Sequence, residues 1–77
     1  MTLESLKGKR VILMGTFFWV GILESVDRAE GSVTLLKPAI VYDTGPWEDV
    51  VYANIEQMPQ KRFCIRIADI NSFGESK

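Results

Sequence analysis

The sequence predicts a mainly β fold, in which a short N-terminal helix is followed by five strands that form a small, strongly bent barrel. Three observations support this prediction. Five short segments are rich in β-branched and aromatic residues. Polar breaks that contain glycine separate several of them. The chain has 77 residues, enough for only one small domain, so we expect a single domain over residues 1–77.

The N-terminal segment 2–7 is predicted to form the short helix. Thr2 is a candidate N-cap, and Gly8 can adopt the left-handed conformation that often ends a helix. Leu3 and Leu6 give the helix one apolar edge. Because so short a helix is unstable alone, it must dock on the rest of the domain.

Five strands are expected within the barrel segment, residues 9–73. Runs of apolar and β-prone residues give their ranges as 10–14, 17–26, 32–42, 61–67 and 69–73. In the fourth range, alternate residues share a face. One face carries Phe63, Ile65 and Ile67, and the other carries Arg62, Cys64 and Arg66.

Two parts of the chain interrupt or follow this pattern. Pro38 cannot donate to a strand ladder, so the third strand should bulge, bend or lie at an edge. Residues 43–60 read as an acidic insertion, in which Pro46 and Pro59 favour one or two helical turns. The alternative is a strand at residues 50–53. Residues 74–77 are predicted to be a frayed tail.

Composition excludes several kinds of site. The chain has one cysteine and no histidine, so it can form neither an internal disulfide nor a thiolate zinc site, and it lacks an imidazole base. Cys64 is expected to be a buried small hydrophobe. We therefore predict that the protein is not an enzyme and needs no cofactor or metal. By elimination, oligomerisation is the expected supplement to so small a core.

The single thiol favours a reducing, cytoplasmic compartment, and hydropathy favours a protein that does not enter a membrane. The segment at the N-terminus does not resemble a secretory signal, and no run of apolar residues reaches the roughly 18 that a membrane span needs. The net charge of −1 argues against a nucleic-acid coat protein. Basic residues nevertheless cluster within 7–10 and 61–66, which allows a local site for phosphates.

Two segments resemble the motifs of the Sm-like (LSm/Hfq) family. Residues 21–27, GILESVD, fit the first Sm motif, G-x-L-x-x-x-D, and together with 35–37 are similar to the corresponding part of bacterial Hfq. Residues 65–70, IRIADI, resemble the I-R-G-x-x-I of the second motif. The order of a short helix and five strands also agrees, so the resemblance extends over nearly the whole chain.

The resemblance implies a cyclic homo-oligomer, in which the fourth and fifth strands of neighbouring subunits pair and leave no open edge. It also implies binding of single-stranded RNA, in RNA processing or regulation. Arg66 holds the place of the arginine that contacts the base, and Asp27 that of the loop brace, while Arg28 could hold phosphates. On the residues alone, Arg66 could instead form a salt bridge at a ring interface or facing solvent, and Asp27 is more often a turn residue that bonds its own backbone.

The positions at which this family usually stacks and reads a base are here Ala29 and Gly31. This departure motivates an alternative, in which the ring is a protein-interaction scaffold that binds through exposed aromatic residues and does not bind RNA. The candidate stacking or interface residues are Phe17, Phe18, Trp19 and Trp47. A monomeric barrel of the Src-homology type that binds a peptide is a third interpretation.

Overall fold

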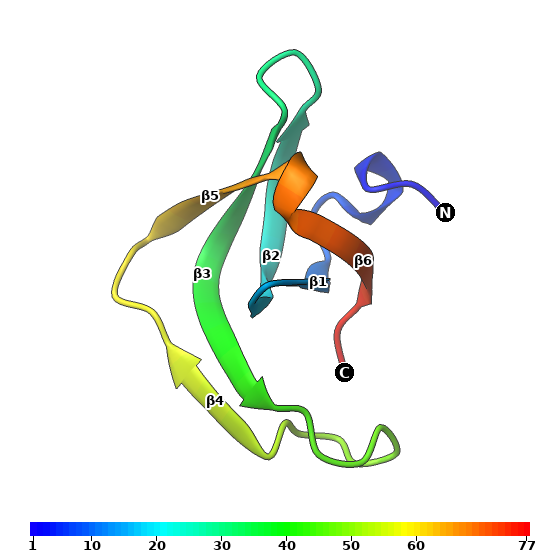
Figure 1. Cartoon of the computed structure of the whole chain (residues 1–77), viewed down its shortest axis with the longest axis vertical. Helices are drawn as coiled ribbons and strands as arrows, with labels where there is room; N and C mark the ends of the chain where they lie inside the picture. Colours follow the sequence, from blue (N-terminus) through cyan, green and yellow to red (C-terminus); the bar gives the residue numbers. More distant parts are fainter.

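The computed structural model describes all 77 residues as one antiparallel sheet of six strands with two 3₁₀ turns (Figure 1). The strands are β1 (Arg10–Gly15), β2 (Phe18–Asp27), β3 (Ser32–Asp43), β4 (Asn54–Gln57), β5 (Arg62–Arg66) and β6 (Ile70–Glu75), and the turns are η1 (Glu4–Leu6) and η2 (Ile67–Asp69). The all-β prediction is confirmed. The sheet is bent but does not close into a barrel, and it has six strands rather than five.

The additional strand arises because β3 pairs with two partners along one edge. Residues 32–36 of β3 pair with β5, and residues 39–43 pair with β4. Between these two ladders, the Met58 amide donates to the Pro38 carbonyl at 2.9 Å and the Lys37 amide donates to the Lys61 carbonyl at 3.3 Å. Strands β4 and β5 are therefore two parts of one interrupted strand that runs antiparallel alongside β3, as Figure 1 shows.

The helix predicted in the acidic insertion is wrong. Residues 46–53 form turns and bends, and the strand that follows begins at Asn54, so the alternative strand at 50–53 is also wrong. The open edge of β3 provides backbone partners for residues 54–57, which outweigh the local helix signals of Pro46 and Glu48.

Of the three outcomes expected at Pro38, a bulge, a bend or an edge position, the structure shows a bulge. Val20 faces Ala39 and Ile22 faces Leu36, so two residues of β3 lie opposite Gly21 alone. A Cβ on Gly21 would approach the Leu36 carbonyl oxygen to 2.8 Å. Glycine at this position lets the two backbones approach closely where the sheet bends.

The helix predicted over residues 2–7 is wrong, since only the 3₁₀ turn η1 forms there. Thr2 and Ser5 satisfy each other's backbone amides through their hydroxyl groups, at 3.2 Å in both cases, which favours a tight local turn over a helix. The docking prediction is confirmed, because Leu3 and Leu6 are both buried. Gly8 has a φ of 85° and its amide donates to the Leu23 carbonyl, which leads the chain into β1.

Both faces of β1 and β2 are buried, in two separate clusters, so these strands read as continuous apolar runs. Tyr52, from the loop between β3 and β4, covers the smaller cluster. The larger cluster comprises Leu3, Leu6, Val11, Leu13, Trp19, Leu23, Val33, Leu35 and Ile65, and the smaller one comprises Ile12, Val20, Val41 and Tyr52.

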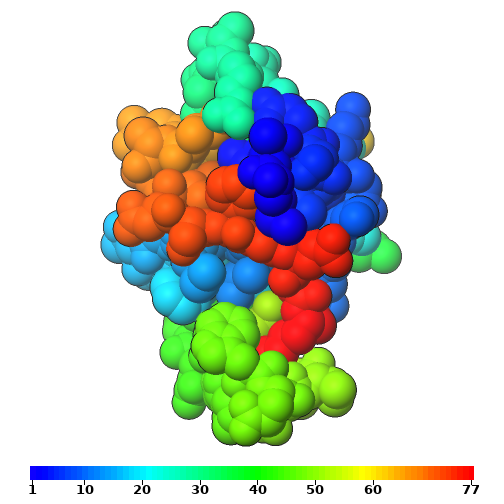
Figure 2. All heavy atoms as spheres, turned by 90° about the vertical axis from the view of Figure 1, so that its right-hand side faces the viewer, coloured from blue at the N-terminus to red at the C-terminus, as the bar shows by residue number.

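The C-terminal residues are held in place, so the predicted frayed tail is wrong. Strand β6 extends to Glu75, and the residues after it run down to the loop between β3 and β4 (Figure 2). Lys77 Nζ donates to the carbonyls of Thr44 and Pro46, at 2.8 and 3.0 Å. The hydroxyl groups of Ser76 and Tyr52 lie 2.6 Å apart. These contacts fix the loop against the sheet. The structure has no helix with the length and apolar character needed to cross a membrane.

Candidate nucleic-acid interface

The two motif-like segments meet at one end of the sheet. The turn between β2 and β3 forms the upper tip of the molecule in Figure 1, and η2 lies beside its base. The Ile67 amide donates to the Gly31 carbonyl at 2.8 Å, and Arg66 pairs in register with Ser32. Arg66, although distant in the chain from Asp27 and Arg28, thus belongs to the same end of the fold as those two residues.

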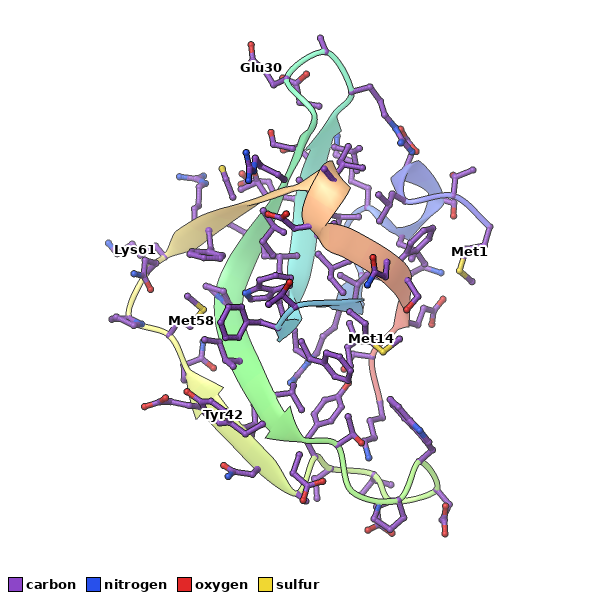
Figure 3. All side chains as sticks on the ribbon, in the orientation of Figure 1. Met1, Met14, Glu30, Tyr42, Met58 and Lys61 are labelled. Atoms are coloured by element: carbon purple, nitrogen blue, oxygen red, sulfur yellow. The ribbon has the colours of Figure 1, made fainter.

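Asp27 stabilises the turn in which it lies. Its carboxylate oxygen Oδ1 accepts a hydrogen bond from the Glu30 amide at 3.0 Å, and its carbonyl accepts one from the Gly31 amide at 2.8 Å. Glu30 projects from the tip of this hairpin (Figure 3). Asp27 therefore fixes the shape of the loop through its own backbone neighbours, and its carboxylate is committed to that contact.

Arg28 is engaged by the N-terminal segment. Its Nε and Nη2 atoms donate to the two carboxylate oxygens of Glu4, at 2.7 and 2.9 Å, in a bidentate pair. Chiefly through these side-chain hydrogen bonds, Arg28 lowers the pKa of Glu4 to about 2, and Glu4 in turn raises the pKa of Arg28. The pair joins η1 to the hairpin, so Arg28 is less available to a phosphate than the sequence suggests.

We expect Arg28→Gln to raise the pKa of Glu4 toward its ordinary value of 4.5. In the parent chain the pKa of Glu4 is lower in the folded state than in the unfolded state. The pair therefore stabilises the fold above pH 4.5, and this contribution is lost as the pH falls toward 2. An NMR titration of the Glu4 carboxyl carbon measures the change. Arg62→Gln, which removes a guanidinium from Glu24 instead, should leave the Glu4 titration unaltered, and an unchanged pKa in Arg28→Gln would contradict the assignment.

Arg66 is the arginine at this end of the sheet that has no short ion pair. Its side chain is 80% exposed, and its Nε atom lies 3.6 Å from the Asp69 carboxylate, a long contact that binds the guanidinium weakly. Arg62, on the same face of β5, is instead held by Glu24 at 3.0 Å. Arg66 can therefore reach an incoming phosphate or base without first breaking a short ion pair.

The prediction that Cys64 is buried is wrong. Cys64 is exposed on β5, and its sulfur lies 3.4 Å from the Thr34 hydroxyl oxygen. The alternation that turns Arg62 and Arg66 outward also turns Cys64 outward, whereas Ile65 enters the core. The exposure of this thiol is therefore decided by which face of β5 it lies on, and its small apolar character does not bury it.

The aromatic residues of β2 and the residue before it are divided between surface and core. Trp19 is 7% exposed and belongs to the larger cluster, while Phe18 packs against the smaller cluster. Phe17 is 56% exposed, and its ring meets that of Trp19 edge to face, with centroids 6.0 Å apart. Beside it lies an open apolar groove of about 280 Å³, lined by Thr16, Phe17, Phe18, Ile40, Val41 and Tyr42.

Two further aromatic residues are exposed: Tyr42 lines this groove, and Trp47 lies beside the C-terminal Lys77. The Tyr42 hydroxyl donates to the Glu56 carboxylate at 2.8 Å, and this bond raises the pKa of Tyr42. Trp47 is exposed on the loop between β3 and β4, with Lys77 Nζ 5.5 Å from the centroid of its ring. The predicted aromatic candidates therefore do not form one surface, since Trp19 is in the core and Trp47 lies by Lys77 and does not line the groove beside Phe17.

One group of polar residues was not predicted as a site. Arg10, Lys37 and Gln57 line a cleft formed by neighbouring strands. Arg10 belongs to the basic cluster within residues 7–10, Lys37 ends the segment 35–37 that resembles part of Hfq without a predicted role, and Gln57 belongs to no recognisable motif. Only the strand pairing brings them together, so no local sequence signal could have identified the cleft.

Comparisons with known proteins found no relative of this chain. No family model, no curated protein and no solved structure matches it. No group of three or more His, Cys, Asp or Glu side chains is arranged to hold a metal ion. The fold and this end of the sheet define an all-β domain in which an exposed arginine without a short ion pair lies beside a braced hairpin.

Proposed function

We propose that this chain is a ring-forming Sm-like protein that binds single-stranded RNA, in RNA processing or regulation. The observation that carries the proposal is the contact between the two motif-like segments. Residues 21–27 lead into the turn whose Gly31 carbonyl accepts a hydrogen bond from Ile67, within residues 65–70. In the family that these segments resemble, the two motifs together form the RNA site.

Two open strand edges support the ring. The predicted fourth and fifth strands correspond to β5 and β6. Strand β5 pairs only with β3, and β6 pairs only with β1, so each has one edge with no strand partner. An open edge can pair with another chain. Pairing of β5 in one copy with β6 in the next is a head-to-tail contact, which gives cyclic symmetry if it closes.

The RNA contact is assigned to Arg66. Arg28 is held by Glu4 and Arg62 by Glu24, whereas Arg66 has only a long contact with Asp69. Asp27 has the supporting role of holding the hairpin. A ring repeats the exposed arginine once in each subunit, so a near-neutral chain can still present a strong local positive potential.

We expect affinity for a short single-stranded oligouridine to fall as salt is raised, because phosphate contacts release counterions. Arg66→Ala should weaken binding and reduce the salt slope by about 1 for each phosphate that the variant no longer neutralises. Fluorescence anisotropy at two salt concentrations measures both quantities. Arg62→Ala is the matched control, since it removes an arginine from the same face of β5 that already has a carboxylate partner, and it should have the smaller effect.

Light scattering on the same samples tests the ring separately. A mass that remains that of a monomer at micromolar concentration would contradict cyclic assembly. If a ring forms but binds no single-stranded RNA, the RNA-binding proposal fails. In that case the exposed groove beside Phe17 and Tyr42 makes a protein-interaction scaffold the better interpretation.

A further inference from the structure

A cleft of about 260 Å³ opens on the sheet face that lies opposite the larger cluster. It is lined by Arg10 of β1, Gly21 and Ile22 of β2, Lys37 of β3 and Gln57 of β4, so four adjacent strands form it. Arg10 pairs with Ile22 and lies two residues before Ile12 of the smaller cluster, and alternation therefore places it on that cluster's face. Ile22 is its single apolar side chain.

The cleft holds two cations that have no anionic partner. The four ion pairs of the structure use Lys9, Arg28, Arg62 and Arg66, and none uses Arg10 or Lys37. No carboxylate lines the cleft. The acidic residues on these four strands are engaged elsewhere: Glu24 pairs with Arg62, Glu56 accepts a hydrogen bond from Tyr42, and Asp27 and Asp43 accept hydrogen bonds from backbone amides of their own turns. Glu75 of the neighbouring strand β6 pairs with Lys9.

The backbone at Lys37 is in an unfavourable conformation. Lys37 is the one residue other than glycine with a positive φ, at 50°, and it also precedes Pro38, which restricts it further. Glycine or asparagine would adopt this conformation at lower cost. Such strain concentrates at functional positions, and here it falls on a residue that contributes one of the two unpaired cations.

Gln57 adds a fixed neutral donor. Its Nε2 atom donates to the Pro38 carbonyl at 3.0 Å, which orients the amide and leaves the second N–H of that group free. The cleft is smaller than the ~300–1,000 Å³ typical of sites for drug-sized ligands. A compact oxyanion fits both its size and its positive charge.

We propose that this cleft binds a phosphoryl group. Arg10 supplies planar N–H donors that match phosphate oxygens in pairs, Lys37 supplies a point charge, and the Gln57 amide donates to a third oxygen. The site lies apart from the hairpin and η2, so it is an addition to the RNA contact proposed at Arg66. Inorganic phosphate and a nucleic-acid phosphate share the chemistry that the cleft recognises.

Titration of the full chain with inorganic phosphate at constant ionic strength tests the proposal. Backbone amide NMR signals of Arg10, Lys37 and Gln57 should shift saturably, while that of Lys7, an exposed lysine outside the cleft, should not. Arg10→Gln and Lys37→Gly should each weaken binding by about tenfold or more. Lys37→Gly removes the cation but also relieves the positive φ, so it should remain folded. Lys7→Gln is the control, because Lys7 is exposed, forms no ion pair and lies outside the cleft, and it should leave phosphate binding unchanged.

Competition by a short single-stranded RNA, with and without a 5′ phosphate, identifies the source of the phosphoryl group. Displacement of phosphate by both RNAs indicates an internal phosphodiester, displacement only by the phosphorylated RNA indicates a terminal phosphate, and displacement by neither indicates free phosphate. Shifts that never saturate, that spread equally to Lys7, Lys61 and Arg66, or that persist unchanged in Lys37→Gly would overturn the proposal. Loss of RNA binding in Arg66→Ala with intact phosphate binding would separate the two sites.

Discussion

The Gly15→Ala substitution should lower the free energy of unfolding by about 3 kcal/mol or more, because the added Cβ would overlap the backbone carbonyl oxygen of Asp69. Gly15 ends β1 where the register with β6 shifts, so that it lies opposite Ile70, directly after η2. Backbone atoms cannot rotate aside as a flexible side chain can. For a chain of 77 residues, a total stability of roughly 4–12 kcal/mol is expected, so the loss would be a large part of it.

Gly74→Ala is the matched control for this prediction. Gly74 belongs to β6, which pairs with β1, and a Cβ built there meets nothing within 4 Å. Its stability should change by less than about 1 kcal/mol. Urea unfolding of both variants at one protein concentration measures the difference. Equal stability of Gly15→Ala and the parent would show that η2 does not approach β1 as closely as described.

The strands that could be predicted are those whose own residues specify them. The ranges expected for β1, β2, β3, β5 and β6 agree with the structure to within two residues at each end, because β-branched runs and alternation are local properties of each segment. The bulge at Pro38 was predictable for a similar reason, since a residue without an N–H must interrupt a ladder wherever the partner strand lies.

The sequence predictions that were wrong concern parts of the fold that depend on contacts between distant segments. Strand β4 exists because half of β3 has an open edge, and the loop before it is fixed by Tyr52 and by the C-terminal Ser76 and Lys77. Its local sequence carries helix signals instead. The candidate site shows the same division. The turn around Asp27 was predictable from its sequence, whereas the engagement of Arg28 by Glu4 required the folded N-terminus.

The Leu35→Ala substitution should cost about 2–5 kcal/mol in the free energy of unfolding, as expected when a fully buried leucine leaves a cavity. Leu35 is 0% exposed, lies in the larger cluster, and faces Leu23 of β2 and Phe63 of β5. It therefore joins the first motif-like segment, on β2, to β5, the strand that leads into the second. Leu35→Met, which nearly conserves volume, should cost less than about 1.5 kcal/mol.

Leu36→Ala is the matched control. It shows whether the loss of stability comes from removing a core side chain or from truncating any leucine in β3. Leu36 is only half-buried and faces the other side of the sheet, so its truncation should cost clearly less than that of Leu35. Trp19, in the same cluster as Leu35, provides the fluorescence signal for urea unfolding. Equal losses for the two variants would contradict the assignment of Leu35 and Leu36 to opposite faces of β3.

If the proposed ring stabilises each subunit, the urea midpoint of Leu35→Ala should also rise with protein concentration, because association favours the folded chain by mass action.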